Sequence, residues 1–488
     1  MRRTKIVATI GPASRDPEIL VRMVAAGMDV ARLNFSHGTH EEHHEVAALV
    51  REAARRAGRP VAILQDLPGP KLRIGALAGD TMPLKVSDVV TFACGGDEEP
   101  GVDGRIPMPW EGLVRAVVPE DIMYLADGRI RLRALAVREG DGEIDAVVEV
   151  GGTVAGRQGM NLPGETAELP SVPEEDLAHL RVGTEIGVDI VALSFVRRPE
   201  DVTFVREHTR VPLVAKIEKP QAVDRAEEIL RVADCVMVAR GDLGIELAIE
   251  TVPMVQKRLL ALAGELARPS ITATQMLDSM VSSSRPTRAE VADVANAILD
   301  GTDAVMLSQE TAVGHYPVEA IEMMAAIARA TEPSLPYREW NDERVSRDAR
   351  DPAYTLAHTA CTAARELELD ALVIPTLSGR SVRLVSAHRP NVPILALSPG
   401  KETVRRCGLM WGVQAASMRR HHVTEDLLAD AASRIVELGW LPPGARVGIT
   451  AGLPSGRPGS TSLFQVQTLP EPGARWSGPR PAPRGPTR

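Results

Sequence analysis

Short apolar runs alternate with amphipathic stretches along the first and middle thirds of the chain. The apolar runs are rich in β-branched residues, and the stretches between them repeat apolar residues at helical spacing. Strands are predicted at 5–11, 30–36, 61–67, 190–196, 212–218, 235–243, 270–276 and 304–310. Helices are predicted among other places at 16–26, 40–57, 220–232, 252–267, 288–299 and 317–330. This regular alternation predicts an α/β fold and favours a closed (β/α)8 barrel over an open doubly wound sheet.

The third predicted strand is not followed directly by a helix. Pro-Gly-Pro follows it at 68–70, and the next helical pattern begins only near Glu174. Hairpin signals such as Asp127-Gly128 interrupt the short apolar runs between them. We therefore expect 1–69 and 169–335 to form the barrel, and 70–168 to form a small inserted β-barrel domain. A domain at that end of the third strand is placed to close over a site as a lid.

A second α/β unit, a regulatory domain, is predicted over 350–468. Helical patterns occur at 353–366 and 424–438, and strand-like runs occur at 371–375, 393–397, 446–451 and 462–466. Residues 376–381 read Thr-Leu-Ser-Gly-Arg-Ser, a turn of small residues before a predicted helix start. Backbone N–H groups in such a turn can hold a phosphate, although a capped strand-to-helix turn has the same sequence pattern. Residues 469–488 are dense in Pro, Gly and Arg, which predicts a disordered tail.

Composition narrows the class of protein. The chain has 56 Lys+Arg against 65 Asp+Glu, and its net charge of -9 argues against a dedicated nucleic-acid or membrane-surface binder. No apolar run approaches the roughly 20 residues of a membrane-spanning helix, and Gly11-Pro12 cuts the N-terminal apolar run too short for a secretory signal. The four cysteines form no Cys-x-x-Cys pair, so we predict neither a disulfide framework nor a zinc site. These features predict a cytoplasmic protein that binds neither nucleic acid nor membranes.

Polar residues end seven of the eight predicted barrel strands, where barrel enzymes carry their active sites. Lys216 and Glu218 lie two positions apart and therefore on one side of their strand, and Asp242 follows the next strand. Two neighbouring carboxylates without a histidine cluster suit Mg2+, although a Lys–Glu ion pair capping the barrel would give the same pattern. Three arginines favour a phosphate-binding site. These are Arg32, Arg73 and Arg240.

In these motifs the chain resembles the pyruvate kinase family, up to about Val466. The matching segments are KIVATIGP at 5–12, ARLNFSHG at 31–38, KIE at 216–218, VARGDLGIE at 238–246, TATQML at 272–277 and MLSQETA at 306–312. The resemblance implies phosphoryl transfer from phosphoenolpyruvate to ADP, giving pyruvate and ATP in the last step of glycolysis. It also implies Mg2+ (or Mn2+) as cofactor and an allosteric homotetramer. The turn at 376–381 would take a phosphorylated effector.

The resemblance also implies roles for single residues. Lys216 would stabilise the transferring phosphoryl group, Arg32 would bind the substrate phosphate, and Glu218 and Asp242 would hold Mg2+. Thr274, near the side of proton delivery, would receive the substrate carboxylate together with the backbone of Gly241 and Asp242. The nucleotide-side residues would be Asn34, His37, Arg73 and Arg181, the last of these standing where many relatives have lysine.

The monovalent-cation position shows a departure from the family pattern. The implied K+ ligands are Asn34, Ser36, Asp66 and the Leu67 carbonyl. Lys71 stands in this neighbourhood, where members that need K+ usually have glutamate. Two adjacent cations repel one another, so we predict that the Lys71 ammonium replaces K+, unless this side chain points into solvent.

Two other functions would use some of the same residues. A Mg2+-dependent lyase or aldolase acting on phosphoenolpyruvate or a 2-oxo acid would explain Glu218, Asp242 and the arginines, but not the inserted domain or the segment 34–38. A non-catalytic metabolite sensor would keep the fold. Such a sensor is disfavoured because Lys216 and both carboxylates are retained.

Overall fold

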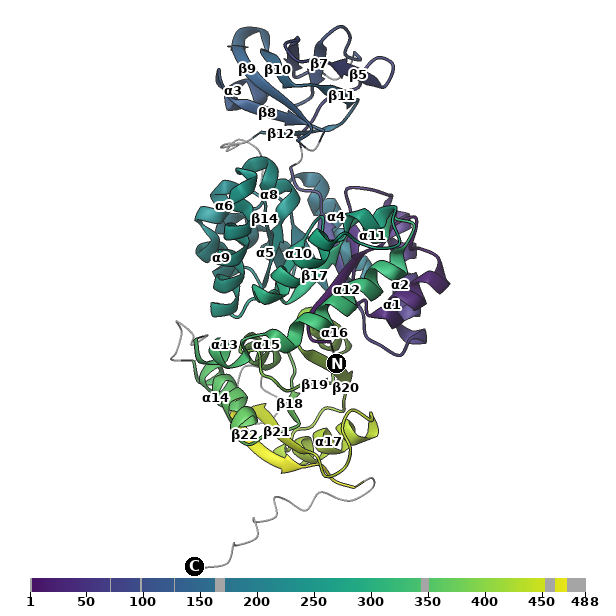
Figure 1. Ribbon diagram of the computed structural model, residues 1–488, viewed down its shortest axis with the longest axis vertical. Coiled ribbons are helices and arrows are strands. Elements are labelled where there is room, and N and C mark those ends of the chain that lie inside the picture. Colours follow the sequence, from purple (N-terminus) through teal and green to yellow (C-terminus); the bar gives the residue numbers. More distant parts are fainter. Residues whose placement is uncertain are drawn as a thin grey trace, which may run out of the picture.

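The computed structural model has three parts stacked along its long axis, with the barrel in the middle (Figure 1). The residues that it describes are 2–70, 72–96, 99–126, 128–162, 172–343, 351–452 and 461–471. Lys71, Asp127 and nearly all of the predicted tail therefore lie outside the described residues.

The middle part is a closed parallel barrel, as the sequence predicts. Its strands follow the order β1-β17-β16-β15-β14-β13-β3-β2 around the barrel. They are β1 (Lys5–Thr9), β2 (Val30–Asn34), β3 (Ala62–Leu67), β13 (Ile190–Leu193), β14 (Leu213–Ile217), β15 (Cys235–Ala239), β16 (Ser270–Ala273) and β17 (Ala304–Leu307). Nearly every residue of these strands is buried, because the helices cover them from outside and side chains fill the inside.

Helices surround this barrel. They are α1 (Pro17–Ala26), α2 (His40–Arg56), α4 (Glu174–Ile186), α5 (Pro199–His208), α6 (Pro220–Asp224), α7 (Ala226–Val232), α8 (Arg240–Glu246), α9 (Val252–Glu265), α10 (Arg288–Leu299), α11 (Gln309–Ala312), α12 (Pro317–Thr331) and α13 (Tyr337–Glu343). Capping boxes begin α2 and α10, where Thr39 pairs with Glu42 and Thr287 with Glu290.

Several predicted elements differ from the structure. The strand predicted at 304–310, for example, ends at Leu307, and α11 begins at Gln309. The predicted strand 235–243 ends at Ala239, and α8 begins at the next residue because Gly241 N donates to the Thr274 side chain instead of a neighbouring strand. The predicted helix 220–232 is two helices, since Arg225, with φ -100° and ψ 20°, leaves the helical conformation between them.

The inserted part is a β-sheet unit with a separate apolar core, which confirms the predicted inserted β-fold. One sheet has the strand order β4-β12-β8-β9-β10-β6-β7, and β5 pairs with β11. The strands are β4 (Leu72–Arg73), β5 (Thr81–Leu84), β6 (Val89–Cys94), β7 (Arg105–Met108), β8 (Ile122–Leu125), β9 (Ile130–Arg138), β10 (Glu143–Val150), β11 (Gly152–Ala155) and β12 (Gly159–Asn161). A short helix, α3 (Leu113–Ala116), follows β7.

The C-terminal part is an α/β sheet of order β20-β19-β18-β21-β22, in which only β22 runs antiparallel to its neighbour. Its strands are β18 (Ala371–Pro375), β19 (Ile394–Ser398), β20 (Val413–Ser417), β21 (Arg446–Gly452) and β22 (Thr461–Thr468). Its helices are α14 (Pro352–Glu366), α15 (Arg380–Ala387), α16 (Lys401–Arg406) and α17 (Thr424–Glu437). The sequence pattern missed β20, which is only partly buried.

The two ends of the barrel face different parts of the chain. The carboxyl ends of the strands face the inserted sheet, because β3 leads into it (Figure 1). The amino ends face the C-terminal sheet: Lys5 Nζ donates to Val413 O at 2.6 Å, and Asp189, just before β13, accepts from Arg405 at 2.7 Å. None of the helices in the described ranges combines the length and hydropathy that crossing a bilayer requires.

Candidate active site

Oxygen atoms surround the side chain of Lys216 at the carboxyl end of β14. Its Nζ lies 3.0 Å from Glu218 Oε1 and 3.2 Å from Asp66 Oδ1, and donates a 2.7 Å hydrogen bond to Ser194 Oγ. Arg32 completes the group, since its Nε lies 2.7 Å from Asp66 Oδ2. We call these five residues the lysine cluster. They come from the ends of four neighbouring strands, as the pattern of polar strand ends predicts.

The register of the strands explains why these side chains meet. Asp66 of β3 lies opposite Asn34 of β2 and Ala192 of β13. Arg32 lies two residues before Asn34, so both side chains project from the same face of β2. Thr9 of β1 lies opposite Arg32 and accepts a 2.9 Å hydrogen bond from its Nη1. The arginine is thereby fixed from two sides.

Burial and pairing set the charges of the lysine cluster. Burial alone would lower the pKa of Lys216, but the carboxylates of Asp66 and Glu218 outweigh it and raise that pKa above its ordinary value. Burial alone would raise the pKa of Asp66, but Lys216 and Arg32 hold it below its usual range. Lys216 is therefore a fixed cation in a buried site, where an ammonium stabilises negative charge more strongly than in water.

A second group lies around Thr274, just after β16. Gly241 N, in the first turn of α8, donates to Thr274 Oγ1 at 2.7 Å, and this hydroxyl donates to Ala273 O at 2.6 Å. Thr274 and Gln275 have φ values of 71° and 53°, in the left-handed region that non-glycine residues rarely adopt. Consecutive strained residues at the mouth of a barrel indicate a site whose geometry is maintained by its surroundings.

Arg240 maintains this geometry and is not placed to bind phosphate, contrary to the sequence-based interpretation. Its Nη2 donates to Thr274 O at 2.8 Å, and its Nη1 pairs with Asp293 Oδ1 at 2.7 Å. The guanidinium is thus already engaged by the protein. The sequence pattern placed Arg240 in a strand over 235–243, but Arg240 is the first residue of α8. Its side chain therefore points in a different direction from a side chain at the end of a strand.

The carboxylates of Glu218 and Asp242 fit a divalent cation. Burial raises the pKa of Glu218 to about 7, with Lys216 opposing this effect and Asp242 adding to it. Phe195 N donates to Glu218 Oε2 at 2.7 Å and so fixes this carboxyl group. Among the described residues, no cluster of three or more His, Cys, Asp or Glu has the geometry of a metal cage. Two carboxylates with further positions left to a substrate are the usual arrangement for Mg2+.

The residues of the predicted K+ position lie at the ends of β2 and β3. Asn34 Oδ1 accepts from Ser36 N at 3.3 Å, and the Leu67 carbonyl accepts from Ser194 Oγ at 2.7 Å. Asp66 belongs to the lysine cluster. Lys71, the predicted replacement for K+, lies outside the described residues.

Asn34 and His37, two of the predicted nucleotide-side residues, lie in one turn after β2, where His37 N donates to Asn34 O at 3.3 Å. His37 is exposed after β2, Arg73 is exposed on the inserted sheet, and Arg181 is exposed on α4. Arg73 Nη1 donates to Arg157 O at 3.3 Å. Within the described part of the chain, neither Arg73 nor Arg181 forms an ion pair with the lysine cluster.

Sequence reasoning placed Ser194 among the polar strand ends but gave it no role, and it missed Thr9 and Asp176. Ser194 bridges Lys216 and the Leu67 carbonyl, and Thr9 holds Arg32. Asp176 on α4 accepts from Gly69 N at 3.0 Å and anchors the Pro-Gly-Pro segment that enters the inserted sheet. A hydroxyl at the end of a buried strand was the available signal for the first two, whereas Asp176 shows none in a helix that begins with three acidic residues.

Comparison with known proteins agrees with this geometry. Residues 1–321 match the family model described as "Pyruvate kinase, barrel domain", and residues 354–467 match "Pyruvate kinase, alpha/beta domain". A pyruvate kinase of Geobacillus stearothermophilus is 42% identical over 96% of this chain and 80% of its own length. Those of Staphylococcus aureus and Bacillus licheniformis are each 40% identical, over 96% and 98% of this chain and 81% and 82% of their own. The chain belongs to the pyruvate kinase family.

Proposed function

We propose that this chain transfers the phosphoryl group of phosphoenolpyruvate to ADP, and that the lysine cluster carries the transfer. The observation that supports this most directly is the buried ammonium of Lys216. It lies between Glu218 and Asp66 at the mouth of a barrel of this family. The phosphorus–oxygen bond to the enol breaks as the bond to the terminal oxygen of ADP forms. The resulting enolate takes a proton at carbon to give pyruvate.

Each residue of the cluster has a distinct task in this proposal. Lys216 faces the transferring group, whose charge spreads over its equatorial oxygens during transfer. Arg32, fixed by Asp66 and Thr9, presents the rest of its guanidinium to the same phosphoryl oxygens. Thr274 and the backbone of Gly241 and Asp242 receive the substrate carboxylate at the positive end of α8. Prearranged donors of this kind need no reorganisation during reaction.

Glu218 and Asp242 would hold the divalent cation that the family implies. When bound, this ion supplies positive charge that offsets the two carboxylates and the phosphoryl oxygens. We propose that the nucleotide is bound by Asn34, His37, Arg73 and Arg181. The inserted domain, 70–168, would act as a lid that brings Arg73 toward the barrel mouth and excludes water.

Regulation is proposed at the C-terminal domain, 350–468. After β18, Gly379 adopts φ 83° and donates its N–H to Thr376 Oγ1 at 2.9 Å, which closes a tight turn before α15. We propose that this turn at 376–381 binds a phosphorylated effector of a cytoplasmic homotetramer.

Pyruvate formation from phosphoenolpyruvate and ADP with Mg2+ tests the proposal. Lys216→Met keeps the apolar stem of the lysine and removes the ammonium, so we expect at least a thousandfold loss of kcat. Lys257→Met, on α9, is the matched control, because it removes a half-exposed lysine that pairs with Asp300, away from the lysine cluster. Pyruvate formation by Lys216→Met within about threefold of wild type would refute the role of Lys216.

The same assay tests the prediction for Lys71. We expect equal rates in K+ and in a non-coordinating counter-ion, and a large activation by K+ would contradict the prediction. Absence of pyruvate in every salt would instead favour a lyase or a sensor.

A further inference from the structure

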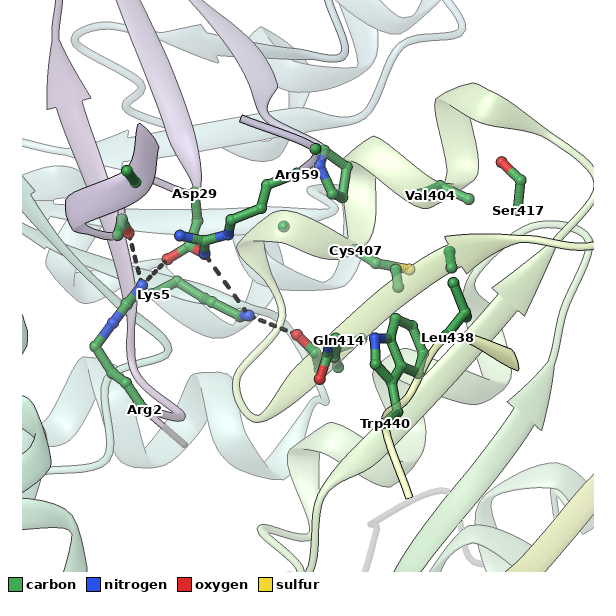
Figure 2. Close-up of a pocket in the computed structure, with 18 of the residues that line it drawn as sticks. Arg2, Lys5, Asp29, Arg59, Val404, Cys407, Gln414, Ser417, Leu438 and Trp440 are labelled. Carbon is green, nitrogen blue, oxygen red and sulfur yellow. Dashed lines mark hydrogen bonds and ion pairs between the residues drawn. The ribbon is translucent and has the colours of Figure 1, made fainter. Parts of the chain in front are cut away.

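A buried lysine at each end of the barrel bonds to the neighbouring part of the chain. At the amino end, Lys5 Nζ donates to Val413 O of the C-terminal sheet at 2.6 Å (Figure 2). At the carboxyl end, Lys219 Nζ lies 2.6 Å from Glu246 Oε1 and donates to Leu162 O of the inserted part at 3.1 Å. Lys219 therefore joins a carboxylate of the barrel to the main chain of the proposed lid.

The pair of Lys219 and Glu246 is shielded from water. Lys219 directly precedes α6, and Glu246 is the last residue of α8. The exposed fraction of the Lys219 side chain is 9%, and that of the Glu246 side chain is 0%. Burial raises the pKa of Glu246, while Lys219 and the Asn161 side chain oppose this effect. Salt screens a buried pair much less than an exposed one, so this contact is a fixed point on the barrel.

The lid side of this contact is the end of β12. Leu162 directly follows β12 and is buried, as is Asn161, the last residue of the strand. In Figure 1 this strand lies on the barrel side of the inserted part. An ammonium has three donors, and two of those of Lys219 reach the barrel carboxylate and the lid carbonyl. Lys219 thereby holds the strand by which the chain leaves the lid.

The position of β12 determines that of Arg73. β12 pairs antiparallel with β4, in a register that places Gly159 opposite Arg73 and Met160 opposite Leu72. Because paired strands share their main-chain hydrogen bonds, a displacement of β12 carries Arg73 with it. The place of Arg73 relative to the barrel therefore depends on the bond between Lys219 and Leu162.

A second contact joins the lid to the same helix. Gly128, in the turn between β8 and β9, lies against Ile245 of α8, since a Cβ added to Gly128 would lie 3.2 Å from Ile245 Cγ1. Ile245 is followed by Glu246, so the end of α8 contacts the lid both directly and through Lys219. The first turn of α8 contains Asp242, one of the proposed Mg2+ ligands. One short helix thus connects the lid to the proposed substrate site.

We propose that Lys219 and Glu246 are positioning residues of the phosphoryl transfer, which anchor β12 to the barrel and so determine where Arg73 meets the nucleotide. This inference rests on the function proposed above and adds how the lid is aligned with the barrel. Both side chains act through Leu162, β12 and β4, and neither has to touch a substrate.

Steady-state kinetics of Lys219→Met and of the double variant Lys219→Met/Glu246→Gln tests the proposal. The double variant leaves neither charge buried without its partner, which protects folding. In each variant we expect the KM for ADP to rise by about fivefold or more and the KM for phosphoenolpyruvate to change by less than about twofold. A merely structural role would lower kcat through loss of folded enzyme and leave both KM values unchanged. Lys257→Met, which removes a half-exposed lysine on α9, is the control and should change neither KM.

The variant Arg73→Gln shows whether the effect passes through Arg73. Alone it should raise the KM for ADP. In the Lys219→Met background it should raise this KM by less than about twofold more, because a displaced guanidinium contributes little that can still be lost. Effects that multiply in full would show that the two residues act independently.

Hydrogen exchange of the full chain, followed by mass spectrometry, measures the anchor without any assay of activity. In the double variant we expect the amides of 159–162 to exchange about tenfold faster, while those of β9 and β10 in the core of the lid exchange as in wild type. Unchanged exchange at 159–162, an unchanged KM for ADP in the double variant, or fully multiplying effects with Arg73→Gln would overturn the inference. A wild type that forms no pyruvate would instead refute the proposed function, and the exchange data alone would then decide whether Lys219 anchors the lid.

Discussion

Burial disfavours the charged form of each ionisable residue around the barrel mouth. Lys216 and Asp66 keep their charges because each is paired with an opposite charge. Asp176 forms no such ion pair with any described residue. Its Oδ2 accepts from Gly69 N at 3.0 Å, and its Oδ1 has no hydrogen-bond partner in the described part of the chain. Burial accordingly raises the pKa of Asp176 to about 7.

This raised pKa predicts a pH dependence of stability. Because the pKa is about 7 in the folded state and about 4 in the unfolded state, the folded state binds the proton more tightly. The stabilisation is complete at acid pH and is lost as the pH rises from about 4 to 7. We expect the Tm of wild type to fall relative to that of Asp176→Asn between pH 5 and 8, by an amount equivalent to about 1–3 kcal/mol.

Glu174→Gln supplies the control for this measurement, since Glu174 is an exposed acidic residue of the same helix. Its Tm profile should run parallel to that of wild type. Parallel profiles for Asp176→Asn as well would show that Asp176 does not titrate in this range.

At the scale of elements, the segment 68–70 connects the barrel to the inserted sheet and also touches the lysine cluster. Gly69 has φ +72°, and a Cβ at this position would lie 2.9 Å from Ser194 Cβ and 3.0 Å from Phe195 Cδ2. Ser194 binds Lys216, and Phe195 N binds Glu218. The connecting segment 68–70 and the lysine cluster are therefore packed against each other.

Gly69→Ala tests this packing. We expect a kcat at least tenfold lower and a free energy of unfolding about 1–3 kcal/mol lower, because the methyl group displaces Ser194 and adds backbone strain. Gly79→Ala is matched to it: Gly79 lies in the inserted part with φ +73°, but a Cβ added there would meet no described atom within 4 Å. An equal loss of kcat in both variants would show that strain alone, and not the contact with Ser194, is responsible.

The sequence predicted elements more reliably than contacts. Hydrophobic periodicity is a local property, and it located the eight barrel strands and placed Lys216 and Glu218 at the end of one of them. The orientation of the Arg240 side chain depends on its ion pair with Asp293, which lies 53 residues away and on another element. Asp176 likewise acquires its raised pKa through burial, against the opposing effect of its hydrogen bond from Gly69 N. No local sequence pattern records this burial.

At the scale of the whole molecule, buried ion pairs join the barrel to the C-terminal sheet. Arg389 Nη1 lies 2.7 Å from Asp303 Oδ1 and its Nη2 donates to Gly301 O at 2.7 Å, with 2% of the Arg389 side chain exposed. The guanidinium also stacks over the Trp411 ring, 4.9 Å from its centroid. This contact lies at the end of the barrel opposite the lysine cluster.

Removing Arg389 should therefore destabilise the molecule far more than removing a surface arginine. In Arg389→Ala the carboxylate of Asp303 would remain buried with hydrogen bonds to Ser270 but without its cation, and we expect a loss of about 3–5 kcal/mol in the free energy of unfolding. Arg55→Ala, which removes an exposed partner of Glu52, should leave the unfolding midpoint unchanged. Denaturant unfolding followed by circular dichroism measures both. An Arg389→Ala midpoint equal to that of wild type would mean that the Arg389–Asp303 pair adds nothing to stability, and that other contacts, such as that of Arg405 with Asp189, hold the two parts together.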